Sequence, residues 1–247
     1  MINTYNESKL HATLKKLYAL EYNGKTEIPI QNWICDIVYA EKKVIEIQTK
    51  NVSKLAKKTE DLLSNGFTVT IVHPVIISKT IETYSKKGIF LKKRKSPRTE
   101  TIYSIFRDLT GIYHLLTKKN FTLEIIFIEI TETRQQTDTP TQLINKSRRF
   151  LKNWIPLEKR LNSILKKKYF KNKEDYLSLI PPSLSESFST PELSKAISML
   201  PEITNLNKSS RMNAEKQARL LIWLYTHMNL LEECGKKGRS KLYKISK

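Results

Sequence analysis

Residues 35–50 read CDIVYAEKKVIEIQTK and decide the fold. Two short apolar runs flank the charged turn AEKK, which is the pattern of a β-hairpin. Alternate side chains of a strand lie on opposite faces. With the turn centred near Glu41, this alternation places Asp36 directly opposite Glu46. Two carboxylates whose Cβ atoms are about 5 Å apart repel each other, so the hairpin needs a reason to carry them.

A divalent cation gives that reason. Carboxylates that converge in a partly dry site are unstable unless a positive charge neutralises them. Glu7 falls within the apolar stripe of a helix predicted over 6–20 and is a third candidate ligand; the preference of acids for the first helical turn explains its place along the helix but not its face. Hard oxygen donors without a Cys or His cluster predict Mg²⁺ or Mn²⁺. Gln48 and Lys50, on the face of Glu46, are placed to orient a water or a phosphate.

The hairpin lies within a predicted α/β domain that spans residues 1–131. Its last strand, FTLEIIFIEI, is apolar on both faces, which is typical of a central strand covered on both sides. The whole pattern predicts a mixed central β-sheet flanked by helices. Helices are expected at 6–20, 53–66 and 100–116, and strands at 25–30, 33–40, 43–50, 67–74, 79–85, 88–93 and 121–130.

Two histidines are candidate accessory residues of this domain. His11 lies at the edge of the apolar stripe of the first helix, one turn after Glu7. His73 precedes Pro74, which is expected to end a core strand at its C-terminal edge, where sites of α/β proteins gather. The alternative for His73 is a hydrogen-bonded histidine at a strand end.

The character of the chain changes after this domain. A polar stretch predicts a linker over 132–146, and a cation-rich stretch predicts a connector over 147–173. Residues 174–247 then predict a small winged-helix (α+β) domain, because helices at 174–180, 191–200 and 213–228 precede a β-ribbon around Gly235 to Gly238.

The formal net charge of +20 favours a polyanionic partner, above all DNA. Part of this excess has a plain alternative, since charge runs are often only solvated. The long C-terminal helix and the ribbon could likewise mediate protein contacts instead of DNA contacts. The candidate DNA-binding residues are Lys92, Lys93, Arg94, Lys95 and Arg98 in a basic run, Lys216 and Arg219 on the last helix, and Lys236, Lys237 and Arg239 in the ribbon.

Other features bound the setting of the protein. The N-terminal stretch MINTYNESKL is polar and carries no secretory signal, and no apolar run reaches the roughly 18 residues of a membrane span. We therefore expect a soluble, cytoplasmic protein without a membrane partner. The two cysteines indicate neither a disulfide framework nor a zinc site.

Asp36 followed by Glu46-Ile47-Gln48, after a helix that carries Glu7, resembles the core of the PD-(D/E)xK nuclease superfamily. The resemblance covers roughly residues 1–130 and implies a restriction endonuclease-like fold. It also implies that Asp36 and Glu46 bind the metal with help from the Ile47 carbonyl, and that Glu7 binds or tunes it. The superfamily pattern has lysine at position 48, where this chain has Gln48. We expect Lys50 to supply that charge.

Three functions compete at this point. The first is a Mg²⁺- or Mn²⁺-dependent DNA endonuclease whose winged helix binds duplex DNA, with phosphodiester hydrolysis as the reaction. The second is a non-catalytic DNA-binding protein on a degenerate nuclease scaffold. The third is a structure-specific repair or junction nuclease acting on branched DNA. A homodimer would suit cleavage of both strands.

Overall fold

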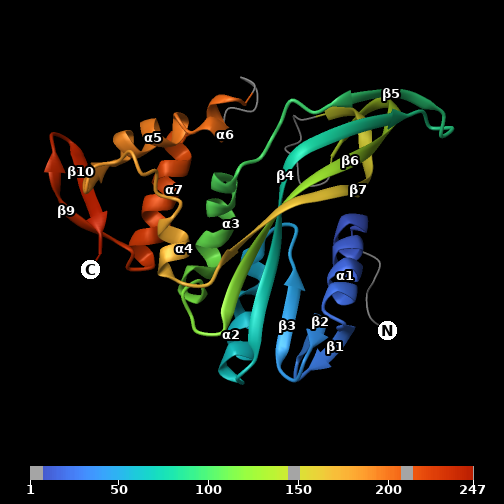
Figure 1. Ribbon diagram of the computed structural model, residues 1–247. Coiled ribbons are helices and arrows are strands. Elements are labelled where there is room, and N and C mark those ends of the chain that lie inside the picture. The colour runs from blue at the N-terminus through green and yellow to red at the C-terminus, as the bar shows by residue number, and fades with distance from the viewer. Residues whose placement is uncertain (1–7, 144–150, 207–213, 247) are drawn as a thin grey trace.

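The computed structural model describes residues 8–143, 151–206 and 214–246. Its main body is a seven-stranded mixed sheet flanked by helices, which confirms the predicted α/β class (Figure 1). The path of the sheet is β1-β2-β3-β4-β6-β7, with β5 paired to β4. Strand β4 is parallel to both β3 and β6, and the other pairs are antiparallel. The strands are Lys25–Ile30 (β1), Trp33–Tyr39 (β2), Lys43–Ile47 (β3), Thr68–Tyr84 (β4), Phe90–Lys95 (β5), Phe121–Gln142 (β6) and Leu151–Phe170 (β7).

Helix α1 (Lys9–Glu21) covers one face of the sheet. It begins where the Ser8 side chain accepts a hydrogen bond from the N–H of His11, which satisfies one of the free donors of the first turn. Its buried residues Leu10, Leu14 and Tyr18 recur at helical spacing and pack on the apolar side chains of β3, β4 and β6.

The opposite face is covered by helical segments and joins a second, larger core. These segments are η2 (Val52–Leu55), α2 (Ala56–Ser64), η3 (Ile102–Ile105), α3 (Phe106–Leu109) and η4 (Thr110–Leu115). Helix α2 ends as predicted at Asn65 and Gly66, where Gly66 has φ +78°, a left-handed conformation that suits glycine. The single helix predicted over 100–116 is wrong, because this segment forms three short pieces. Most of its apolar residues are nevertheless buried, namely Ile102, Ile105, Phe106, Leu109, Ile112 and Leu116.

Strand β4 corrects the prediction that Pro74 ends a strand and that a separate strand covers 79–85. The strand runs unbroken to Tyr84. Strand β3 ends at Ile47, which pairs with Val72, so Pro74 lies beyond the last β3 pair. A proline has no backbone N–H to donate to a neighbouring strand. On the side of β4 that faces β3, no described strand is paired with Pro74, so no donor is needed there.

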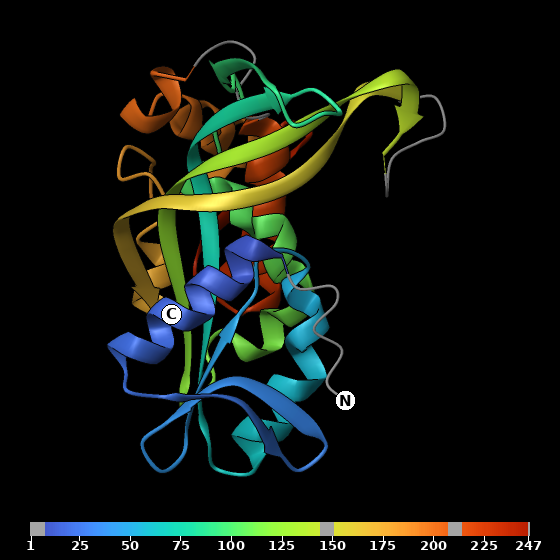
Figure 2. The same ribbon diagram turned by 90° about the vertical axis from the view of Figure 1, so that its right-hand side faces the viewer.

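The predicted linker over 132–146 is wrong in its described part, because residues 132–142 continue strand β6. The predicted basic connector over 147–173 is likewise mostly strand β7, which pairs with β6 in antiparallel fashion. Together with β4 and β5, these strands extend beyond the helices as a curved arm (Figures 1 and 2).

The C-terminal part packs against the helices of the second face. It comprises α4 (Lys173–Leu177), β8 (Ser187–Ser189), α5 (Thr190–Ser198), α6 (Pro201–Thr204), α7 (Ala214–His227), β9 (Leu231–Lys237) and β10 (Ser240–Ile245). Strand β10 lies between β8 and β9 in a three-stranded sheet. Helix α7 buries Ala218, Leu221 and Tyr225, and Met228 just after the helix is buried as well. No helix among the described residues is long and apolar enough to cross a membrane.

Candidate active site at the β2–β3 hairpin

The two facing carboxylates meet where strands β2 and β3 part. The ladder runs from Tyr39 opposite Lys43 to Ile37 opposite Ile45, so the next facing positions are 36 and 46. At these two positions, the carboxylates of Asp36 and Glu46 accept hydrogen bonds from the backbone in place of the ladder hydrogen bonds between the strands. The Asp36 N–H donates to Glu46 Oε1 at 3.2 Å, and the Ile47 N–H donates to Asp36 Oδ2 at 2.8 Å. The hairpin therefore brings the two acids together as its register predicted.

Lys58 of helix α2 supplies a positive charge to this pair. Its ammonium lies 2.5 Å from Glu46 Oε2 and donates to the Ile34 carbonyl at 2.6 Å. The side chains of Lys58 and Glu46 are only 8% and 3% exposed. Burial raises the pKa of Glu46 to about 7, against the opposing charge of Lys58 and with a further contribution from Asp36.

Asp36 faces helix α1 and, unlike Glu46, has a pKa below its ordinary value. Its Oδ2 atom lies 3.3 Å from His11 Nε2. Burial acts to raise the pKa of Asp36, but the hydrogen bond and charge of His11, the Ile47 N–H and the charge of Lys58 outweigh it and hold the pKa below its ordinary value. His11 thus takes the accessory position expected from the sequence. Glu7, the third predicted ligand, lies outside the described residues.

Gln48 and Lys50 do not continue the strand. Because β3 ends at Ile47, the expectation that both share the face of Glu46 by strand alternation is wrong. The Gln48 amide nitrogen donates to the carbonyls of Lys50 and Asn51, so Gln48 stabilises the turn that follows. His73 accompanies this turn: its Nδ1 is 2.7 Å from the Gln48 carbonyl, and burial lowers its pKa. This contact matches the hydrogen-bonded histidine weighed as the alternative.

A group of cations lies beyond this turn, on the base of the arm. Burial first, and the charge of Lys50 next, lower the pKa of Lys159 on β7, with Lys79 adding to the effect. Lys79 and Arg134 both pair with Glu132, which is almost completely buried and holds them in place. The charge of Lys50 thus acts on this basic group, in which Glu132 and Glu100 supply negative charge.

The predicted DNA-binding residues fall into two groups. Lys92, Lys93, Arg94 and Lys95 lie on the exposed strand β5, and Arg98 follows it. Lys216 and Arg219 on α7, with Lys236, Lys237 and Arg239 of the β9–β10 ribbon, lie at the other end of the molecule (Figure 1). Ion pairs of Arg219 with Glu215 and of Lys237 with Glu192 neutralise part of the second group.

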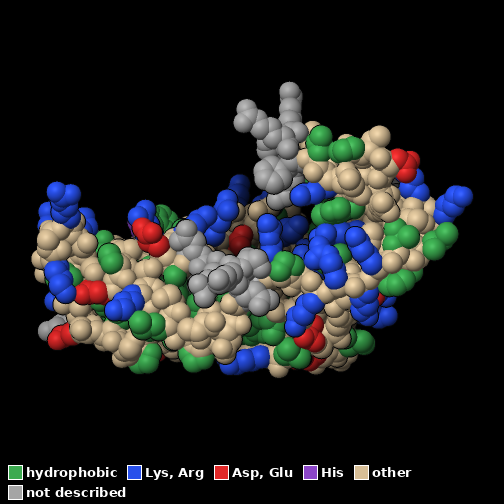
Figure 3. Space-filling view, turned by 90° about the horizontal axis from the view of Figure 1, so that it is seen from above, with side chains coloured by type: hydrophobic (Ala, Val, Ile, Leu, Met, Phe, Trp, Pro, Cys, Tyr) green, Lys and Arg blue, Asp and Glu red, His purple; other side chains and the backbone are tan. Residues whose placement is uncertain are grey.

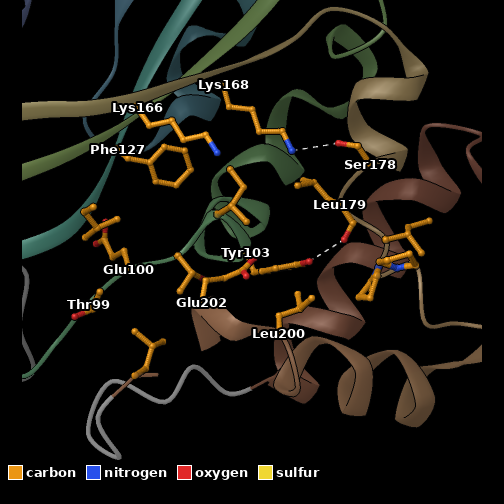
Figure 4. A pocket seen from close by; sticks show the side chains of 17 residues that line it. Thr99, Glu100, Tyr103, Phe127, Lys166, Lys168, Ser178, Leu179, Leu200 and Glu202 are labelled. Carbon is orange, nitrogen blue, oxygen red and sulfur yellow. Dashed lines mark hydrogen bonds between the residues drawn. The ribbon is translucent and has the colours of Figure 1, made fainter. Parts of the chain in front are cut away.

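A cavity of about 550 Å³ lies between the sheet and the C-terminal part (Figure 4). Lys166 and Lys168 enter it from β7, where Lys168 donates to the Ser178 hydroxyl at 3.2 Å. Its size suits a small organic molecule. The two lysines and the two acids Glu100 and Glu202 give the lining no net charge. The charge of the lining therefore indicates neither an anionic nor a cationic ligand.

Sequence reasoning missed Lys58 and Lys159. Lys58 had a signal, because it interrupts an apolar stripe of helix α2 in which Leu55 and Leu62 face the core. Lys159 had no such signal in the sequence. It lies in a run of basic residues, and nothing in that run indicates that the segment forms a strand.

The donor set fits a hard cation only in part. Among the described residues no group of three His, Cys, Asp or Glu side chains could hold a metal ion. Asp36 and Glu46 are nevertheless two adjacent carboxylates, and Mg²⁺ is commonly bound by one or two carboxylates together with waters and substrate phosphates. Glu46 is already paired with Lys58, so the hairpin offers two carboxylates of which one has a cation beside it.

Comparisons with known proteins give a family without a described activity. Residues 8–171 match the family described as Domain of unknown function (DUF8091). An "uncharacterized protein" of Treponema pallidum (strain Nichols) is 26% identical over 243 residues, which cover 98% of this chain and 87% of that protein. No solved structure matches the chain.

Proposed function

This chain belongs to the DUF8091 family, a domain of unknown function, and we propose that it is a metal-dependent endonuclease that hydrolyses phosphodiester bonds of DNA. One observation carries the proposal. Asp36 and Glu46 meet at the open end of the β2–β3 hairpin, with the buried cation Lys58 beside them. Buried like charges are costly, and structural purposes alone are better served by apolar residues. Such a pair is typical of a catalytic centre.

Asp36 and Glu46 are the residues that would hold the cation, together with the Ile47 carbonyl that the superfamily resemblance implies. Bound Mg²⁺ or Mn²⁺ supplies Lewis-acid activation of a water and of the scissile phosphate. The protein groups do the rest. His11 orients Asp36 and keeps it ionised. Lys58 takes the place of the cation that position 48 lacks, and its ammonium can hold the attacking water or the phosphate oxygen that gains charge.

The surrounding fold is compatible with this assignment. The order of α1, the β2–β3 hairpin, α2 and β4 is the order of the restriction endonuclease-like core to which the sequence bears resemblance. In the C-terminal part, α4, β8, α5, α7, β9 and β10 follow one another as in a winged helix, which supports a duplex-binding module there. Positive charge beside the hairpin supports a nucleic-acid substrate.

Plasmid cleavage tests the proposal. Supercoiled plasmid and a branched duplex are incubated with Mg²⁺ or Mn²⁺ and wild type, Asp36→Asn, Glu46→Gln or Glu41→Gln. Glu41 is an exposed acid in the turn of the same hairpin and serves as the matched control. We expect wild type and Glu41→Gln to cut, and the other two variants to lose at least a hundredfold in rate. Cutting by Asp36→Asn at the wild-type rate contradicts the proposal. A preference for the branched substrate identifies a junction nuclease.

The ion pair between Lys58 and Glu46 favours a second candidate function. It neutralises the hairpin without a metal, which is what a non-catalytic DNA-binding scaffold requires. In that case wild type binds DNA in EDTA and in Mg²⁺ with equal affinity and cuts neither substrate, and Asp36→Asn leaves the affinity in Mg²⁺ unchanged.

A further inference from the structure

The β4–β5 hairpin at the end of the arm exposes three consecutive apolar side chains. Ile89, Phe90 and Leu91 are 62%, 52% and 45% exposed. The preceding turn is well defined: the Ser85 N–H donates to the Ile89 carbonyl at 2.8 Å, and Gly88 has φ +77°, which suits glycine. The Phe90 ring makes an edge contact with the Tyr84 ring, with centroids 5.6 Å apart. An ordered turn thus presents a small apolar tip to solvent.

Basic residues flank this tip on both sides in the sequence. Residues 85–95 read SKKGIFLKKRK, with six cations and no acid. Lys86 pairs with Asp138, and Lys93 lies 3.7 Å from Glu82. Lys87, Lys92, Arg94 and Lys95 form no ion pair within the part of the chain that the structure describes. An apolar tip set in unneutralised cations is complementary to a polyanion that also offers flat apolar surfaces.

The arm also connects the tip to the hairpin site. Arg94 and Lys92 lie opposite Ile81 and Thr83 of β4, and Lys79 shares this face by strand alternation. Lys79 forms an ion pair with Glu132 at 3.0 Å, and the charges of Lys79 and Lys50 both lower the pKa of Lys159 on β7. In the view from above, Lys and Arg side chains predominate over Asp and Glu along the arm (Figure 3). Basic side chains therefore predominate along the arm between the tip and the hairpin site, with Lys79 and Lys93 paired to Glu132 and Glu82.

We propose that the β4–β5 tip is a wedge that inserts Phe90, with Ile89 and Leu91, between base pairs of duplex DNA while Lys92 and Arg94 bind the flanking phosphates. This deepens the proposed nuclease function and rests on it, because it names kinked duplex as the form of the substrate. Side chains such as Phe, Leu and Ile unstack base steps and bend DNA in this way. A lipid surface or a second copy of the chain would also cover an apolar tip. The basic side chains along the arm favour DNA.

Unstacking and bending are measured with full-length protein in EDTA, so that no cleavage occurs. The probe is a 30-base-pair duplex with 2-aminopurine in the centre and a fluorophore pair at the ends. Wild type is compared with Phe90→Ala, Phe90→Trp and the double variant Lys92→Gln/Arg94→Gln. Phe90 is half exposed, so its substitution leaves the fold intact, and circular dichroism verifies this.

We expect wild type to raise 2-aminopurine fluorescence and to bring the duplex ends together. Phe90→Ala removes both signals and weakens binding about tenfold, as expected for the loss of one stacking side chain. Phe90→Trp keeps both signals, because it retains a stacking ring. The double charge variant lowers the slope of log affinity against log salt by about 2, because two phosphate contacts are lost.

Several outcomes overturn the wedge. Binding of wild type to the duplex without unstacking is one such outcome, and unstacking by Phe90→Ala to the same extent as by wild type is another. Binding to anionic lipid vesicles that Phe90→Ala abolishes, without duplex binding, assigns the tip to membranes. A concentration-dependent dimer that Phe90→Ala dissociates assigns it to a second copy. The plasmid test gives an independent result. If the protein unstacks the duplex but does not cut in Mg²⁺, the wedge proposal stands and the nuclease proposal is wrong. If it cuts but does not unstack the duplex, the nuclease proposal stands and the wedge proposal is wrong.

Discussion

Replacing Lys58 with methionine tests whether the hairpin carboxylates depend on this one cation. Methionine fills a similar volume but leaves Glu46 without the ammonium 2.5 Å away. Glu46 has a pKa of about 7 in the folded protein, against 4.5 for an ordinary glutamate. The folded state therefore binds the extra proton between these pH values, and stability falls as pH rises across this window. Well above pH 7, Glu46 of wild type is ionised in both the folded and the unfolded state, so its contribution to the free energy of unfolding no longer changes with pH.

In Lys58→Met the pKa of Glu46 moves higher, because the largest opposing charge is gone. The decline then continues beyond pH 7 at about 1.4 kcal/mol per pH unit. At pH 9 the variant should have lost more stability than wild type relative to their difference at pH 7, with an upper limit of about 2.7 kcal/mol that applies when Glu46 stays protonated up to pH 9. Urea unfolding in EDTA from pH 5 to 9 measures this. Parallel curves for wild type and variant would refute the reasoning, and Glu46→Gln/Lys58→Met should remove the extra slope.

Three further results are expected. Tyr18→Phe removes the hydroxyl that donates to the buried Glu124 carboxylate at 2.5 Å and should cost about 1–3 kcal/mol in urea unfolding; an unchanged midpoint would show that water replaces the donor. His11→Ala should raise the pKa of Asp36, as measured by the carboxyl ¹³C shift during acid titration, because the largest opposing interaction is lost. Mg²⁺ at ten times its Kd should stabilise wild type by about 1.4 kcal/mol and leave Glu46→Gln unchanged; equal stabilisation of both would place the ion elsewhere.

The hairpin could be predicted because its information is local. A turn sequence between two apolar runs fixes the register, and the register alone places Asp36 opposite Glu46. The central strand was equally clear, since residues 121–130 are apolar on both faces and are almost all buried. In both cases neighbouring residues carry the whole signal.

The arm could not be predicted for the opposite reason. Residues 132–142 and the first part of strand β7 lie beyond the helices, whereas the rest of β7 runs along helix α1, where Leu161 and Ile164 are only partly buried. No regular apolar alternation therefore marks either segment as a strand. Their neighbours hold them through backbone hydrogen bonds, which any sequence can supply. The interrupted apolar stripe of α2 marks Lys58 as a residue that faces the core, but its partners, the Ile34 carbonyl and Glu46, depend on how α2 packs against β2 and β3.

The charges at the hairpin predict how metal and DNA affect each other. At pH 8 Asp36, Glu46 and Lys58 sum to −1, so the metal-free hairpin repels a phosphate, whereas a bound divalent cation changes the sum to +1. Asp36→Asn/Glu46→Gln makes the same change without metal. This variant should bind duplex DNA in EDTA more tightly than wild type, by about 1 kcal/mol per charge removed, or about thirtyfold at low salt. Fluorescence anisotropy measures the affinity, with Glu41→Gln as the control for a charge lost elsewhere in the hairpin. Equal affinities of wild type and double variant would mean that DNA does not pass over the carboxylates, and the nuclease assignment would then lose its substrate.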